Sequence, residues 1–137
     1  MKNVLVLCTG NSCRSQMAEG YLRLFAADKA KVFSAGVERH GLNPKAVWAM
    51  QDDGIDISHH TSNLVEDYAD TAFDFVITVC DHAQERCPVF PTKAIKIHQN
   101  FPDPSKFVGT SAEMEAEFRR VRNLIKTFCK SFVERTL

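Results

Sequence analysis

The sequence has no excess of charge of either sign, because 17 lysines and arginines balance 17 aspartates and glutamates. Nucleic acids and anionic membrane surfaces attract strongly basic proteins, so we expect neither as a partner. Long hydrophobic runs are also missing, since no stretch approaches the ~20 apolar residues that span a bilayer. The apolar run at residues 4–8 is too short to be the core of a secretion signal. These absences predict a cytoplasmic protein. An anion that binds to it must be held by a local site, because the net charge gives no general attraction.

No pair of cysteines has the C-x-x-C spacing, so the five cysteines predict neither a zinc ribbon nor a thioredoxin-type dithiol. Structural disulfides are rare in the cytoplasm, and each cysteine therefore needs its own interpretation. Cys129 follows Ile125 by one helical turn in an apolar stripe, which predicts a core position. The histidines lack the spacing of metal ligands, and we expect surface or structural roles for all five: His40, His59, His60, His82 and His98.

Internal repeats, low-complexity segments and linker-like stretches are absent as well, and the length suits a single domain covering residues 1–137. What the sequence does contain is an alternation of strand and helix patterns. Apolar runs predict strands at residues 3–8, 31–35, 74–80 and 94–98, and helical periodicity predicts a helix at 14–28. A second helix is predicted between Asn43 as its N-cap and Gly54 as its terminator, and a last helix after the capping box of Thr110 and Glu113. We therefore predict an α/β fold with a four-stranded parallel sheet flanked by helices on both faces.

The stretch "VLVLCTGNSCRSQMAEG", residues 4–20, passes from a predicted strand into a predicted helix through a short polar loop. Such a turn directs backbone N–H groups and the positive end of the helix dipole toward one point, which suits a tetrahedral anion. Arg14 can bind that anion with two parallel hydrogen bonds. Gly10 and Asn11 are residue types that tolerate unusual backbone conformations. We predict an oxyanion site formed by Thr9, Gly10, Asn11, Ser12, Cys13, Arg14 and Ser15.

Cys8 ends the predicted strand at the base of this loop, and Cys80 ends another apolar run, "DFVITVC". Ligands of parallel sheets bind beyond the carboxyl ends of the strands, so both thiols are expected beside the site. The field of the loop favours the Cys8 thiolate, and comparable environments lower the pKa of a cysteine thiol from ~8.5 to about 3.5–7.5. The structural alternatives are a buried strand cysteine in a loose C-x5-R pattern for Cys8, and a small core residue for Cys80.

The segment "VLCTGNSCRSQMAEG" resembles the active-site loop of the low-molecular-weight protein tyrosine phosphatase superfamily, which includes the thioredoxin-coupled arsenate reductases. The resemblance implies that Cys8 is the nucleophile and that Arg14 holds the oxyanion. It also implies that Asp103, in "NFPDPSK", is the general acid that protonates a leaving oxygen. The alternative for Asp103 is that an Asp-Pro pair only shapes a turn.

The segment "VCDHAQERCP" is similar to the redox segment of the thioredoxin-coupled reductases and contains Cys80 and Cys87. On this resemblance Cys8 attacks arsenate, and Cys80 then attacks Cys8 as arsenite leaves. Cys87 next attacks Cys80, and thioredoxin reduces the resulting Cys80–Cys87 disulfide. A serine and a lysine follow "PDP", where the phosphatases typically carry aromatic residues, and this difference also favours the reductase branch.

Two other functions stay open at this point. A low-molecular-weight tyrosine phosphatase would use Cys8, Arg14 and Asp103 but would have no use for Cys80 and Cys87. A non-catalytic anion-binding or redox-sensing domain would turn over neither substrate. The reductase interpretation implies arsenate as substrate, with phosphate or sulfate able to occupy the loop. It also implies thioredoxin as external reductant, no tightly bound cofactor and a monomer.

Some members of the superfamily bind potassium beside the loop, at positions that correspond to Asn11, Glu19 and Ser34. The fourth position is Asn63, where an acidic residue is expected. Because that negative charge is lost, the resemblance implies at most a weak potassium site.

Overall fold

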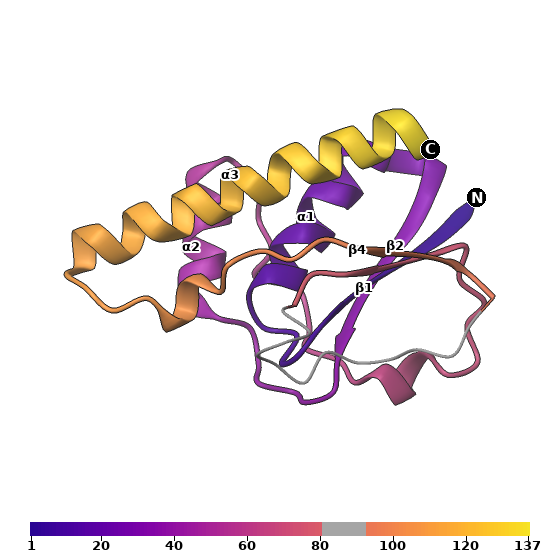
Figure 1. Cartoon of the computed structure of the whole chain (residues 1–137), viewed down its shortest axis with the longest axis horizontal. Coiled ribbons are helices and arrows are strands. Elements are labelled where there is room, and N and C mark those ends of the chain that lie inside the picture. The colour runs from indigo at the N-terminus through magenta and orange to yellow at the C-terminus, as the bar shows by residue number, and fades with distance from the viewer. Residues whose placement is uncertain (81–92) are drawn as a thin grey trace.

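The computed structural model describes residues 1–80 and 93–137, and Figure 1 shows their arrangement. Within these residues four strands form one sheet, in which every neighbouring pair is parallel. The order across the sheet is β2-β1-β3-β4, and the strands are β1 (Lys2–Cys8), β2 (Ala30–Gly36), β3 (Phe75–Thr78) and β4 (Ile95–His98). The predicted four-stranded parallel sheet is confirmed.

Helical elements of the described residues lie on both faces of the sheet, as predicted, although all three α-helices lie on one of them. The α-helices α1, α2 and α3 pack against one another on one face, whereas the loop around the 3₁₀ helix η2 covers the other (Figure 1). None of the helices in residues 1–80 and 93–137 is long and apolar enough to cross a bilayer. Their bounds are α1 (Arg14–Ala26), η1 (Ala27–Lys29), α2 (Pro44–Asp52), η2 (Val65–Tyr68), η3 (Pro104–Lys106) and α3 (Ser111–Thr136).

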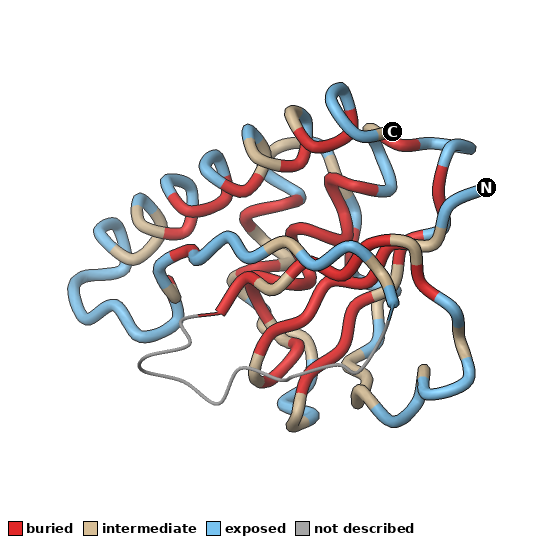
Figure 2. Tube along the Cα trace, turned by 45° about the vertical axis from the view of Figure 1, so that its right-hand side comes forward, coloured by how far each residue is buried: buried red, intermediate tan, exposed pale blue. Residues whose placement is uncertain are grey.

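Alternate residues of β1 contribute to two separate parts of the core. Val4 packs in a cluster with Met17 of α1 and Ile125 of α3, whereas Leu5 packs on the opposite face with Phe73. Figure 2 shows the buried residues concentrated in the central strands and in the inward-facing turns of the helices. A strand that is covered on both faces needs a continuous apolar run, which is what "VLVL" supplies.

The N-termini of two helices are capped by the side chains that the sequence indicated. Asn43 caps α2, because its Oδ1 accepts a hydrogen bond from Lys45 N at 2.8 Å, and Gly54 follows the helix with φ 77°. At α3, Thr110 Oγ1 accepts from Glu113 N at 3.2 Å, and Glu113 Oε1 accepts from Thr110 N at 3.0 Å. The predicted cap and capping box are confirmed.

The parallel register brings Cys8 and Cys80 to the same edge of the sheet. β1 and β3 are neighbours, Leu7 is paired with Thr78, and Val79 N donates to Leu7 O at 3.0 Å. Cys8 and Cys80 directly follow Leu7 and Val79, so they leave adjacent strands at their carboxyl ends. Both cysteines are buried there.

Candidate active site

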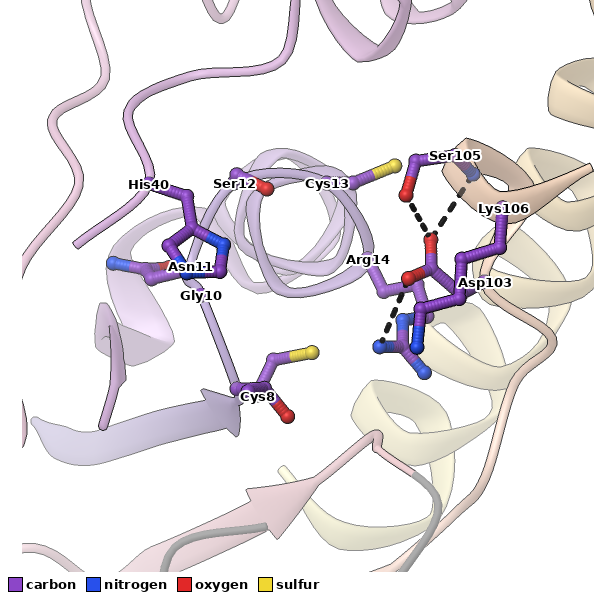
Figure 3. A pocket seen from close by; sticks show the side chains of 11 residues that line it. Cys8, Gly10, Asn11, Ser12, Cys13, Arg14, His40, Asp103, Ser105 and Lys106 are labelled. Atoms are coloured by element: carbon purple, nitrogen blue, oxygen red, sulfur yellow. Dashed lines mark hydrogen bonds and ion pairs between the residues drawn. The ribbon is translucent and has the colours of Figure 1, made fainter. Parts of the chain in front are cut away.

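A cavity of about 180 Å³ opens at the carboxyl end of β1, between the loop of residues 9–13 and η3 (Figure 3). This volume suits a small oxyanion and is below the ~300 Å³ at which pockets for larger organic ligands begin. Ser15 is the member of the predicted oxyanion set that is absent from the lining. The lining residues are Cys8, Thr9, Gly10, Asn11, Ser12, Cys13, Arg14, His40, Asp103, Ser105 and Lys106.

Asn11 holds the loop in shape through both its backbone and its side chain. Its φ of 47° is left-handed, as predicted, and the residue is fully buried. Asn11 Nδ2 donates to Ser34 O at 3.2 Å and to Asn63 O at 3.4 Å. Asn11 Oδ1 accepts from Ser15 Oγ at 2.9 Å, which places Ser15 beneath the loop. The side chain therefore ties the loop to β2 and to the segment before η2.

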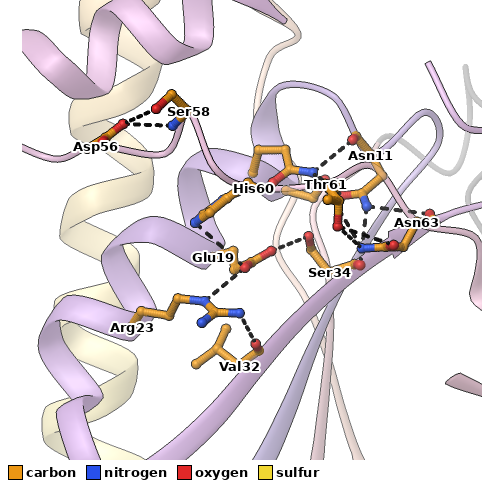
Figure 4. A network of polar contacts seen from close by, with 12 residues as sticks. Asn11, Glu19, Arg23, Val32, Ser34, Asp56, Ser58, His60, Thr61 and Asn63 are labelled. Atoms are coloured by element: carbon orange, nitrogen blue, oxygen red, sulfur yellow. Dashed lines mark hydrogen bonds and ion pairs between the residues drawn. The ribbon is translucent and has the colours of Figure 1, made fainter. Parts of the chain in front are cut away.

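Gln16 and His60 form a further layer of support that the sequence did not predict (Figure 4). Gln16 Nε2 donates to Asn11 O and to Thr61 O, both at 3.0 Å. The other polar atom of this amide group, Gln16 Oε1, can only accept, and it accepts from His60 Nδ1 at 3.0 Å. Burial lowers the pKa of His60, although the Glu19 carboxylate acts in the opposite direction. No short-range pattern could have indicated this support, because its partners lie more than 40 residues apart in the sequence.

The three positions that correspond to a potassium site, Asn11, Glu19 and Ser34, do lie together (Figure 4). Glu19 Oε1 accepts from Ser34 Oγ at 2.5 Å, and Glu19 Oε2 accepts from Arg23 Nε at 2.8 Å. A cation at this place would compete with the Arg23 guanidinium for the same carboxylate. Among the residues that the structure describes, no cluster of three or more His, Cys, Asp or Glu residues is suited to a metal ion.

Arg14 and Asp103 meet at the wall of the cavity. Arg14 Nη1 donates to Phe101 O at 3.1 Å, and Arg14 Nη2 lies 3.6 Å from Asp103 Oδ2. Asp103 Oδ1 accepts from Ser105 N at 3.0 Å and from Ser105 Oγ at 2.6 Å. Figure 3 shows the guanidinium beside the carboxylate. The structure thus brings Asp103 to the same cavity as Cys8 and Arg14, although it lies far from both in the sequence.

Gly10 is explained by packing and not by the backbone freedom that we expected of it. Positive φ in the loop occurs at Asn11, and Gly10 is not among the residues with positive φ. A Cβ atom built on Gly10 would lie 2.2 Å from His40 Nδ1. Glycine therefore leaves room for the His40 ring to pack on the loop.

The cysteines differ in their redox state. Cys8, Cys13 and Cys129 are buried thiols, whereas Cys80 is fully buried and disulfide-bonded. Cys87, which the resemblance assigns to the redox segment, lies outside the described residues.

Cys13 and Cys129 are both surrounded in a way that keeps them protonated. Burial raises the pKa of the Cys13 thiol, and the Asp103 carboxylate raises it further. Burial also raises the pKa of Cys129, whose Sγ lies 3.7 Å from Ala18 O in the core. The predicted core position of Cys129 is confirmed.

The fold and the cavity define a phosphatase-like α/β protein with an oxyanion loop, and comparisons with known proteins agree. Residues 3–137 match the family model described as "Low molecular weight phosphotyrosine protein phosphatase". The chain belongs to this family, and the resemblance of its loop is confirmed.

The most similar relatives include the proteins named "Arsenate reductase" from Halalkalibacterium halodurans and from Bacillus subtilis. Each is 47% identical to this chain over 133 residues, which cover 97% of the chain and 96% of the relative. A solved structure described as "An arsenate reductase in the phosphate binding state" is 36% identical, and the match covers 100% of both chains with a TM-score of 0.83.

Proposed function

We propose that the protein reduces arsenate to arsenite through Cys8, Cys80 and Cys87, with thioredoxin as the external reductant. The observation that carries this proposal is that Cys8 ends β1 and Cys80 follows the end of the adjacent strand β3, at the edge where the oxyanion loop lies. Ester hydrolysis needs one nucleophilic cysteine, whereas the two-electron reduction of arsenate needs a second thiol. The activity named for the relatives supports the same function.

Arsenate binds, on this proposal, in the loop of residues 9–14 above Cys8. The N–H groups of the loop and the N-terminus of α1 stabilise the negative charge, and Arg14 binds two of the arsenate oxygens. The buried hydrogen bonds of Asn11 support a loop that keeps its shape while the chemistry proceeds. Phosphate and sulfate would occupy the same place because their geometry is also tetrahedral.

In the first step the Cys8 thiolate attacks arsenic, and one hydroxyl oxygen of arsenate leaves as water. Asp103 supplies the proton for that oxygen, a contribution that is typically about 10²–10⁴-fold in rate. The contacts of Asp103 with Arg14 and Ser105 support this role, because they place the carboxyl group at the cavity. Arsenic stays pentavalent in this step.

In the second step the Cys80 thiolate attacks Cys8 Sγ. The S–As bond breaks, and its electron pair stays on arsenic, which becomes trivalent and leaves as arsenite. The two sulfurs are oxidised to a disulfide, which Cys87 then transfers to a Cys80–Cys87 pair for reduction by thioredoxin. The disulfide-bonded state of Cys80 supports Cys80 as a redox-active sulfur of the relay.

We further propose that residues 1–137 act as a single cytoplasmic domain, as a monomer, and without a tightly bound cofactor. One chain supplies the loop, the arginine and the acidic residue to the same cavity, so the proposed chemistry does not require a second subunit.

The relay is tested by following NADPH oxidation with arsenate, thioredoxin and thioredoxin reductase. We expect Cys80→Ser and Cys87→Ser to fall to background, because each removes a sulfur through which electrons must pass. Cys129→Ala is the matched control, since Cys129 lies in the core away from the cavity. Wild-type rates in the Cys80 and Cys87 variants would refute the relay.

The family description keeps phosphatase activity as the second candidate. It would use Cys8, Arg14 and Asp103 from the same cavity. A wild-type protein that hydrolyses aryl phosphates, fails to reduce arsenate and is unaffected by Cys80→Ser would establish the phosphatase function. Loss of arsenate turnover in Cys80→Ser with retained aryl phosphate hydrolysis would establish the reductase.

A further inference from the structure

One side chain of the cavity, His40, has no part in the chemistry described above. It lines the same cavity as Cys8 and Asp103. In Figure 3 its ring lies on one side of the loop, and Asp103 lies on the other. An oxyanion bound above Cys8 would therefore lie between an imidazole and a carboxyl group.

The backbone holds His40 in this place. His40 N donates to Gly10 O at 3.1 Å, and on either side Glu38 N donates to Thr9 O at 3.0 Å and Asn43 N donates to Ser12 O at 2.9 Å. Residues 38–43 therefore run alongside the oxyanion loop, bonded to it at three points. The close approach of the ring to Gly10 shows that it packs directly on the loop backbone.

The two nitrogens of the His40 ring have different surroundings. Nε2 is hydrogen-bonded to the carboxylate of Glu38, whereas Nδ1 is the ring atom closest to the position of a Gly10 Cβ. A histidine whose Nε2–H is given to a carboxylate exchanges its other proton at Nδ1, toward the loop. The charged or ionisable groups that share the cavity with this ring are Cys8, Cys13, Arg14, Asp103 and Lys106.

The proposed reaction, on which this inference rests, needs protons in both of its steps. In the first step Asp103 gives its proton to the oxygen that leaves as water, and it is then a carboxylate. In the second step the S–As electron pair moves onto arsenic, and negative charge builds up on the three remaining oxygens. Arsenous acid is neutral near pH 7, so these oxygens must take up protons as it leaves.

We propose that His40 is the second proton donor of the cycle. Its Nδ1–H bond breaks and an O–H bond forms on the departing arsenite, while Glu38 stabilises the ring through Nε2. Solvent supplies the other protons and reprotonates the ring, which is half exposed. His40 and Asp103 thus serve successive steps from opposite walls of the cavity.

The test is arsenite release by His40→Ala, measured with and without added imidazole in the thioredoxin-coupled assay. We expect kcat to fall by about 10²-fold and imidazole to restore part of the lost rate, because a free imidazole can enter the space of the deleted ring. His40→Gln, which keeps the size and polarity of the side chain, should show the same loss. His59→Ala is the control, since His59 is exposed and outside the cavity. This variant should release arsenite at the wild-type rate, with or without imidazole.

Two results would overturn the proposal. One is a wild-type rate in both His40 variants. The other is a loss that imidazole does not rescue and that comes with loss of phosphate-induced thermal stabilisation, because His40 would then only shape the loop. A wild-type protein without arsenate turnover would instead refute the proposed function.

Discussion

Asn11 has two separate tasks in the loop. Its backbone is left-handed, a conformation that costs most residues roughly 1–2 kcal/mol. Its side chain donates to Ser34 O and accepts from Ser15 Oγ in a place without solvent access. Water cannot replace these bonds, so their loss leaves buried polar groups without partners.

Asn11→Gly and Asn11→Ala separate the two tasks. Glycine keeps the left-handed backbone and loses the side-chain bonds, whereas alanine loses both. We expect each variant to lose about 2 kcal/mol or more of the wild-type free energy of unfolding, measured with urea. Asn11→Ala should lose at least as much as Asn11→Gly. The control is Asn123 on the exposed face of α3, where alanine should be more stable than glycine by about 1 kcal/mol. If alanine were more stable than glycine at position 11 as well, the left-handed backbone of Asn11 would not matter for stability.

At the scale of elements, Asp53 joins three helices. It follows α2, and its Oδ2 accepts from Tyr21 Oη of α1 at 2.7 Å and from Lys126 Nζ of α3 at 2.9 Å. Burial raises the pKa of Asp53, but the hydrogen bonds from Tyr21 and Lys126 outweigh this effect and leave the pKa below its usual value. The carboxylate therefore stabilises the packing of the helices that carry the loop.

Asp53→Asn tests this contribution through its pH dependence. Because the folded-state pKa lies below the unfolded-state value, the stabilisation is complete above about pH 4 and is lost as the pH falls through the folded-state pKa. We expect the variant to be less stable than the wild type by about 1 kcal/mol at neutral pH, a modest value because the carboxylate is partly exposed. Urea unfolding across the acid range should show this difference shrinking. A difference in stability that stays the same at low pH would contradict the contribution of the Asp53 carboxylate. Asp28→Asn, at an exposed position, serves as the control.

For the whole molecule, the site is a place where distant parts of the chain meet. The loop after β1 is bonded to the segment at residues 38–43 and to Ser62 and Asn63, and Arg14 at the start of α1 donates to the carbonyl of Phe101. An oxyanion that binds the loop therefore stabilises the assembled fold, because the unfolded chain has no such site.

Phosphate should raise the thermal stability of the protein. At a concentration of about 100 times its dissociation constant, the expected gain in unfolding free energy is about 2.7 kcal/mol. Arg14→Lys should lose most of this gain, because lysine cannot form the two parallel hydrogen bonds. Calorimetry at matched ionic strength, with chloride as the control anion, measures the effect. An equal gain from chloride, or in Arg14→Lys, would contradict specific binding at the loop.

The features that were predictable from the sequence depend on short-range relations. The strand pattern of residues 3–8, the Asn43 cap and the Thr110 capping box each need only neighbours within a few positions. The left-handed backbone of Asn11 and the passage from Cys8 into α1 are local in the same way.

The sequence by itself therefore determined the parallel sheet, the oxyanion loop and the edge at which Cys8 and Cys80 emerge. Only the tertiary structure decided that Gln16 and His60 support the loop, and that Gly10 makes room for His40. The physical reason is that a hydrogen bond or a ring contact joins whichever groups the fold brings together. Their separation along the chain carries no signal of that meeting.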